Sequence, residues 1–129
     1  MLAPSGLLSA TVGVRDGRIA TIGAAPLASE ETIDARGLWL VPGAVDGHTH
    51  MEAPAFGVVS RDTFESGTKA AAAGGVTTIV DFTAAAGGTL GREIEDRAAA
   101  AQRAAIDIAL HAEVVGWRRE RAPEVAEAV

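Results

Sequence analysis

Val76-Thr77-Thr78-Ile79-Val80-Asp81-Phe82 is the stretch that decides the fold. It is rich in β-branched residues and nearly all apolar, which predicts a strand buried on both faces, as in a parallel sheet. A helix is expected before it, over residues 62–73, with Asp62 as its cap and Glu65 reaching back to that cap. Gly74-Gly75 would end this helix just before the strand.

The same alternation extends in both directions from this strand. Upstream, the break at Pro42-Gly43 is followed by a strand that runs to His50. Downstream, we expect a helix over about residues 91–105, a strand over 106–115 and a helix from 118 to 129. The order β-α-β-α-β-α predicts right-handed parallel units, which fit either a doubly wound sheet or a (β/α) barrel.

The first forty residues have a different pattern. Two alternating apolar runs, residues 10–14 and 19–23, flank Asp16-Gly17, which is a strong signal for a β-hairpin. A turn-rich connection follows, within which residues 32–35 are expected to form a short strand. We therefore divide the chain into residues 1–40 and 41–129.

Composition excludes several classes of function. The 129 residues carry 17 acidic and 11 basic side chains, for a net charge of −6, so neither a nucleic acid nor a membrane surface is expected as a partner. The absence of cysteine excludes disulfides, cysteine-ligated zinc and a thiol nucleophile. No apolar run is long enough to span a bilayer or to act as a signal peptide, and we expect a cytoplasmic protein.

His48 and His50 are the residues most suggestive of chemistry. Side chains two apart on a strand point to the same face, so both imidazoles should converge at the strand's carboxyl end. There they suit a divalent cation such as zinc, with Asp46 one step deeper as a residue that could orient a ligand. The alternative is that His48 and His50 are ordinary surface or core histidines that bind no metal. A catalytic zinc also needs a third protein ligand.

At this point the sequence resembles a known family, the cyclic amidohydrolases. The segments that carry the resemblance are Val41-Pro42-Gly43-Ala44-Val45-Asp46-Gly47-His48-Thr49-His50-Met51, residues 63–82, residues 107–111 and, upstream, residues 14–23. Met51-Glu52 stand where dihydroorotases carry Leu-Arg. Asp81-Phe82 replace the Met-Pro of dihydroorotases and allantoinases. Both departures favour the dihydropyrimidinase and D-hydantoinase branch.

The resemblance implies an α/β fold: the first three β/α units of a TIM-type (β/α)8 barrel, preceded by part of a small β-sandwich. It implies a hydrolase that opens hydantoins or dihydropyrimidines with two zinc ions, bridged by a carbamylated lysine and a hydroxide. His48 and His50 match ligands of the first zinc. Lys69, the only lysine, falls in a helix and is not assigned as a ligand.

Four more residues each have a functional and a structural interpretation. Asp81 either supports the site or caps a loop, and Met51 and Phe56 either contact a substrate or pack on the barrel rim. His111 is expected to be a hydrogen-bonded histidine of the barrel rather than a ligand.

Because a complete barrel takes about 250 residues, we expect this chain to be a fragment that is inactive alone. The downstream lysine, the further histidines and the general-base aspartate of the family have no counterpart in it. The family generally forms homotetramers. The alternatives are a non-catalytic remnant or interaction module of the same fold, or an allantoinase-like enzyme.

Overall fold

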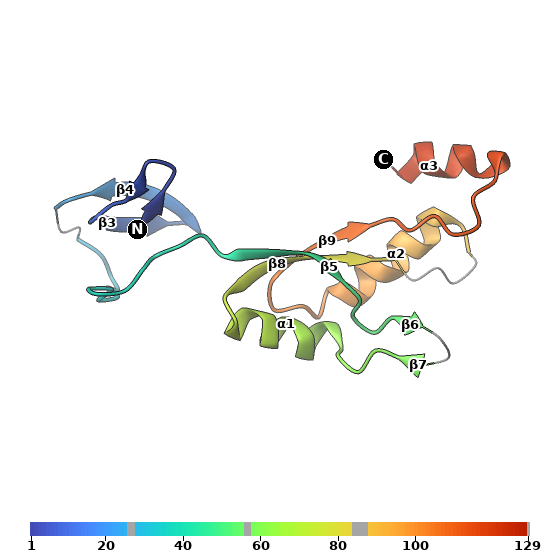
Figure 1. Ribbon diagram of the computed structural model, residues 1–129, viewed down its shortest axis with the longest axis horizontal. Helices are drawn as coiled ribbons and strands as arrows, with labels where there is room; N and C mark the ends of the chain where they lie inside the picture. The colour runs from blue at the N-terminus through green and yellow to red at the C-terminus, as the bar shows by residue number, and fades with distance from the viewer. Residues whose placement is uncertain (26–27, 56–57, 84–87, 129) are drawn as a thin grey trace. The chain divides into compact units, whose positions relative to one another are not determined.

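The computed structural model describes residues 1–25, 28–55, 58–83 and 88–128 (Figure 1). The chain divides into two compact units, Met1–Pro42 and Gly43–Val129. The sequence places this boundary two residues earlier. Among the described residues, no helix is long and apolar enough to cross a membrane.

The first unit consists of two antiparallel strand pairs. β1 (Leu2–Ala3) pairs with β2 (Gly6–Leu7), and β3 (Thr11–Arg15) pairs with β4 (Arg18–Gly23). The turn of the second hairpin has positive φ at both central residues, 52° at Asp16 and 69° at Gly17, as a tight two-residue hairpin turn requires. The predicted hairpin is therefore present.

The strand expected over residues 32–35 is wrong. The Asp34 carboxylate accepts a hydrogen bond from the backbone amide of Arg36 at 3.1 Å, and the Arg36 guanidinium closes on it at 2.6 Å. A side chain that binds the backbone two residues ahead favours a turn over an extended strand. The ion pair to Arg36 lowers the pKa of Asp34.

The second unit is built on a parallel sheet with the strand order β5-β8-β9. These strands are β5 (Ala44–Thr49), β8 (Val76–Phe82) and β9 (Asp107–His111). A small antiparallel pair, β6 (Pro54–Ala55) and β7 (Val58–Val59), follows β5. The predicted alternation of parallel strands and helices is thus observed.

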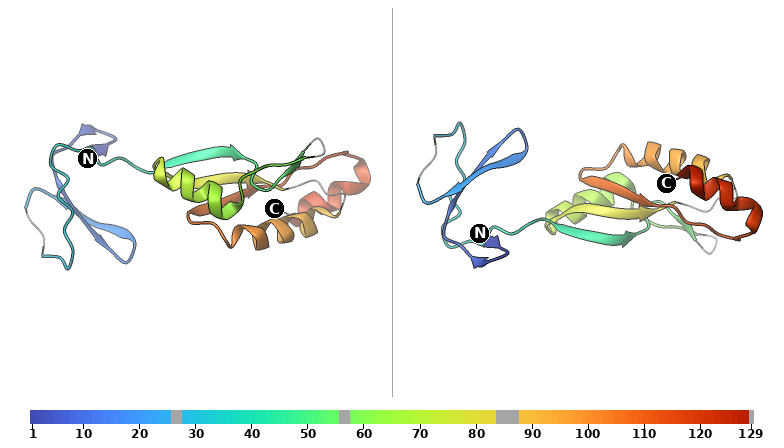
Figure 2. Two further views of the ribbon diagram at one scale, coloured as in Figure 1. Left: turned by 90° about the horizontal axis from the view of Figure 1, so that it is seen from below. Right: turned by 90° about the horizontal axis from the view of Figure 1, so that it is seen from above.

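Two helices, α1 (Phe64–Ala73) and α2 (Leu90–Ala101), lie along the same face of this sheet (Figures 1 and 2). That arrangement is what two successive right-handed crossovers produce. The C-terminal part consists of a 3-10 turn, Arg119–Arg121, and α3 (Ala122–Ala128). Pro123 lies in the first turn of α3, where a missing amide costs nothing.

The start of α1 differs from the prediction. Thr63, not Asp62, is the N-cap: its hydroxyl accepts from the Ser66 amide, and the Ser66 hydroxyl accepts from the Thr63 amide. Asp62 instead accepts from the Ser66 hydroxyl, and Glu65 pairs with Lys69 at 2.6 Å. Thr63 and Ser66 have the spacing of a capping box shifted by one residue.

α2 and β9 are shorter than predicted. After Ala101 the chain tightens into short turns, and the Ala105 amide donates to the Thr68 hydroxyl of α1 at 2.9 Å. This contact from another helix ends α2 before residue 105. β9 ends at His111, well before the predicted residue 115.

The core lies between the sheet and its helices. Its buried apolar side chains are Phe64, Ile79 and Leu90. On β8, Ile79 and Asp81 are buried on the helix-covered face, whereas Val80 and Phe82, on the other face, are half-buried. Fully buried side chains therefore occur on one face of the strand only, which corrects the expectation of two buried faces.

Candidate metal centre

His48 and His50 come together at the carboxyl end of β5. Their Nε2 atoms are 3.1 Å apart, and their ring planes are at 72°. The convergence expected from their spacing is thus observed. Both histidines are exposed.

The separation of the two Nε2 atoms fits a shared cation. Two nitrogens bound at about 2.0–2.1 Å to one tetrahedral zinc lie about 3.3–3.4 Å apart, close to the observed spacing. Neutral imidazole is also a common zinc ligand. No group of three or more His, Cys, Asp or Glu side chains that could hold a metal occurs among the described residues. The two histidines could therefore supply two of the three protein ligands that a catalytic zinc needs.

Phe82 forms the floor beneath the histidine pair. Its ring centroid is 4.4 Å from that of His48 and 5.0 Å from that of His50. On the other side, His111 lies 4.9 Å from Phe82. Within the described part of the chain the His111 ring has this aromatic neighbour and no hydrogen-bond partner, contrary to the expectation of a hydrogen-bonded histidine.

Among the described residues, no hydrogen bond joins Asp46 to either imidazole. Its Oδ1 instead accepts from the backbone amide of His48 at 3.1 Å. Asp46 therefore fixes the backbone that carries the first histidine, not its ring.

Asp81 is fully buried at the end of β8 and is the centre of a polar network. Its Oδ2 accepts from the Thr49 hydroxyl at 2.9 Å and from the Met51 amide at 2.8 Å. Its Oδ1 accepts from Arg97 Nε at 2.8 Å. Of the two interpretations offered for Asp81, these contacts favour support of the segment that holds His50.

The other two candidate residues lie in the segment after β5. Met51 packs on α1, because a Cβ added at Gly67 would be only 2.5 Å from its sulfur. This contact favours the packing interpretation for Met51. Phe56 lies outside the described residues.

Arg97 is the residue that sequence reasoning missed. The mixed charges of residues 92–103 predict a solvated helix face, yet Arg97 is 6% exposed and Glu93 is 7% exposed. Arg92, by contrast, is on the exposed side, 2.8 Å from Asp96. The positions of these residues along the helix could have indicated their burial. Glu93 and Arg97 follow the buried Leu90 by three and seven residues, so all three share one helix face.

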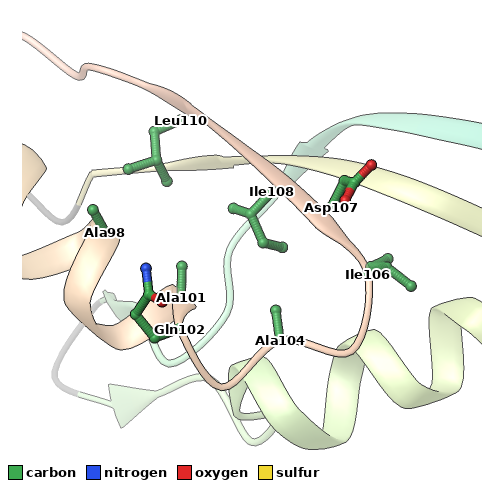
Figure 3. Close-up of a pocket in the computed structure, with 8 residues that line it drawn as sticks. All are labelled: Ala98, Ala101, Gln102, Ala104, Ile106, Asp107, Ile108 and Leu110. Atoms are coloured by element: carbon green, nitrogen blue, oxygen red, sulfur yellow. The ribbon is translucent and has the colours of Figure 1, made fainter. Parts of the chain in front are cut away.

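A concavity lies between the end of α2 and β9 (Figure 3). It has a volume of about 350 Å³. Small and aliphatic side chains line most of it: Ala98, Ala101, Ala104, Ile106, Ile108 and Leu110. It holds no histidine, and we assign it no chemistry.

A histidine pair at the carboxyl end of a parallel strand, in a β/α series, is typical of metal-dependent hydrolases. Comparisons with known proteins narrow this class. The chain is 43% identical to the D-hydantoinase of Streptomyces coelicolor over 133 aligned residues, which cover 97% of this chain and 28% of that protein. It is 48% identical to the D-hydantoinase of Ralstonia pickettii over 82 residues, or 64% of this chain and 18% of that protein. No family model matches.

Solved structures agree with these sequence matches. A D-hydantoinase structure matches 83% of this chain and 24% of its own, with 42% identity and a TM-score of 0.77. The D-hydantoinase from Bacillus sp. AR9 matches 92% of this chain and 26% of its own, with 35% identity and a TM-score of 0.82. The chain is therefore a homologue of the D-hydantoinases and dihydropyrimidinases, as the sequence predicts. It spans about a quarter of the length of these relatives.

Proposed function

We propose that this chain supplies the first three β/α units of a (β/α)8-barrel hydrolase that opens the ring of hydantoins or dihydropyrimidines, preceded by part of a β-sandwich. The observation that carries this proposal is the histidine pair at the carboxyl end of β5, 3.1 Å apart. In β/α barrels, active sites form at the carboxyl ends of the strands. The names of its relatives, D-hydantoinase and dihydropyrimidinase 2, support this substrate class.

In this proposal His48 and His50 hold a divalent cation, with zinc as the first choice. When bound, such a cation lowers the pKa of a water and polarises an amide carbonyl. The chain's own residues prepare the two imidazoles: Asp46 fixes the backbone at His48, and the Phe82 ring supports both histidine rings. The apolar floor also keeps water from one side of the pair.

The remaining ligands of the proposed site, including the bridging lysine of a second zinc, would come from residues beyond these 129. Lys69 does not suit that role, because it lies on α1 and pairs with Glu65, with both side chains exposed. The apolar hollow between α2 and β9 supports a longer barrel, since a further helix packed there would cover it.

The second candidate is a non-catalytic module of the same fold. The two candidates differ in whether the histidine pair serves catalysis. Homotetramer formation and a cytoplasmic location stay predictions under both.

A chimaera tests the proposed activity. This chain would replace the stretch that it matches in the D-hydantoinase of Streptomyces coelicolor, and ring opening of hydantoin and dihydrouracil would be measured after incubation with zinc. We expect hydrolysis of at least one substrate, and its loss in His48→Ala and His50→Ala. Lys69→Gln is the matched control and should keep the activity.

Two outcomes would contradict the enzyme proposal. One is a folded chimaera that binds zinc and opens neither ring, which would favour the non-catalytic module. The other is activity that survives both histidine substitutions.

A further inference from the structure

The histidine pair is next to a buried ion pair that sequence reasoning did not anticipate. Arg97 of α2 and Asp81 of β8 are 6% and 0% exposed, and Arg97 Nε donates to Asp81 Oδ1 at 2.8 Å. Both partners also make hydrogen bonds to one short segment, residues 49–51. Asp81 Oδ2 binds the Thr49 hydroxyl and the Met51 amide, while Arg97 Nη2 donates to the Met51 carbonyl.

These contacts enclose His50 on both sides. Thr49 precedes it and Met51 follows it, so His50 is the one residue between the two anchored positions. β5 ends at Thr49, beyond which regular pairing with β8 stops. The hydrogen bonds that Asp81 accepts and Arg97 donates therefore take the place of the sheet in fixing the backbone that carries His50.

The segment is held further along as well. Glu52 has a φ of 48°, which turns the chain away from the sheet. Its carboxylate accepts from the Phe64 amide at 3.1 Å and pairs with Arg103 at 2.7 Å. The turn after His50 is thus fixed to α1 and to the end of α2.

Stability alone is a poor explanation for the Arg97–Asp81 pair. Desolvating two charges is costly, and apolar side chains of similar volume often replace a buried ion pair without loss of stability. A planar guanidinium, by contrast, offers several donors in fixed directions. Here the guanidinium also lies 4.6 Å above the Phe64 ring, which restricts its orientation further.

We propose that the Arg97–Asp81 pair positions His50 against His48, so that the two imidazoles are preorganised for one cation. Arg97 and Asp81 are positioning residues in this account and do not touch the metal. The inference rests on the proposed metal role of the two histidines. Loss of an outer contact of this kind typically lowers metal affinity by about 10–100-fold.

The test separates positioning from stability. In the double variant Asp81→Leu/Arg97→Met of the 129-residue chain, apolar side chains replace the ion pair. Affinity is measured by titration with Cu²⁺-iminodiacetate, whose open coordination positions accept two imidazoles, and stability by the midpoint of urea unfolding. We expect an affinity at least about 10-fold lower with a midpoint close to that of the unmodified chain. Arg92→Met removes an exposed arginine from the same helix and should change neither.

Thr49→Val keeps the test decisive if the double variant fails to fold. It removes one hydrogen bond to Asp81 and leaves the ion pair in place, so we expect a smaller loss of affinity in the same direction. Unchanged affinity in a folded double variant, or in Thr49→Val when the double variant does not fold, would overturn the inference.

Single variants separate this inference from the proposed function. If His48→Ala and His50→Ala bind Cu²⁺-iminodiacetate as tightly as the unmodified chain, the metal role of the pair is wrong. If they bind it weakly while the double variant and Thr49→Val bind it normally, only the positioning role is wrong.

Discussion

Gly43 lies where the chain enters β5 and passes very close to the neighbouring strand. A Cβ added at this residue would overlap Oγ1 and Cγ2 of Thr77 and would be 2.6 Å from its Cβ, which is closer than real Cβ atoms approach a neighbour. Glycine is therefore required here because the Thr77 side chain lies against the Gly43 backbone, and not because of an unusual φ.

Gly43→Ala should lower the free energy of unfolding by about 1–3 kcal/mol, because an overpacked site forces the backbone or the neighbour to move. Gly91→Ala on α2 is the matched control: its new methyl group meets open space, so stability should stay the same or rise by up to about 1 kcal/mol. Urea unfolding followed by circular dichroism measures both. Partial restoration of stability by Thr77→Ala in the Gly43→Ala background would identify the contact, because alanine removes Oγ1 and Cγ2 of Thr77 but keeps its Cβ. Equal effects of the two glycine variants would contradict this explanation.

At the residue scale, the sequence predicts those site features that depend on local periodicity. The convergence of His48 and His50 follows from the two-residue repeat of a strand and needs no tertiary information. The burial of Arg97 depends on Asp81, which arrives from a different element. Two charged residues on the inner face of α2 also weaken the apolar pattern by which a buried face is recognised. The role of Asp81 stayed open for the same reason.

At the scale of elements, α3 is attached to the start of α2 through Glu124. Its Oε2 accepts from the Leu90 amide at 3.1 Å, which satisfies one of the free donors at the helix N-terminus. Arg121 pairs with the same carboxylate at 3.0 Å. The hydrogen bond from Arg121, followed by that from the Leu90 amide, lowers the pKa of Glu124.

This lowered pKa predicts how the attachment depends on pH. Because Glu124 binds its proton less readily in the folded chain, its stabilisation is complete above the usual glutamate pKa of about 4.3. It is lost as the pH falls through the lower folded-state pKa. The melting temperature of Glu124→Gln should therefore lie below that of the unmodified chain at pH 7, and the gap should close towards pH 3.

Glu127→Gln, on the exposed side of α3, is the control for loss of one negative charge. A gap between the unmodified chain and Glu124→Gln that stays constant from pH 7 to pH 3 would show that the carboxylate charge is not what attaches α3.

The sequence predicted whether a segment is a helix or a strand better than it predicted the residues at which that segment begins and ends. The hairpin around Asp16-Gly17 and the three parallel strands follow from turn chemistry and from β-branched apolar runs. The cap of α1 was misplaced by one residue because Asp62 and Thr63 are both good capping residues. The end of α2 depends on Thr68 of another helix, and the expected strand over 32–35 gave way to the turn at Asp34.

At the scale of the whole molecule, the two units differ in how much they bury. None of the described side chains in residues 1–42 is buried, whereas the second unit has a core around Phe64, Ile79 and Leu90. Isolated hairpins are marginally stable in water. Segments with few buried contacts also open at low free-energy cost.

Hydrogen–deuterium exchange should therefore show a sharp contrast along the chain. Peptides from β3 and β4 should exchange almost as fast as an unfolded chain, and those from β8, the central strand, should be the most protected. Mass spectrometry of peptic fragments from the 129-residue chain measures both. Equal protection of β3 and β8 would show that the first unit is stabilised in solution by contacts beyond those described.

The Arg97–Asp81 pair also imposes an order of events during synthesis. Arg97 follows Met51 by 46 residues, so at about 5–20 residues per second the ribosome takes roughly 2–9 s to reach it. Throughout that interval the nascent chain carries both imidazoles without the guanidinium that fixes the segment around them. The arrangement of the histidine pair is therefore completed only once Arg97 has been made, several seconds after the histidines themselves.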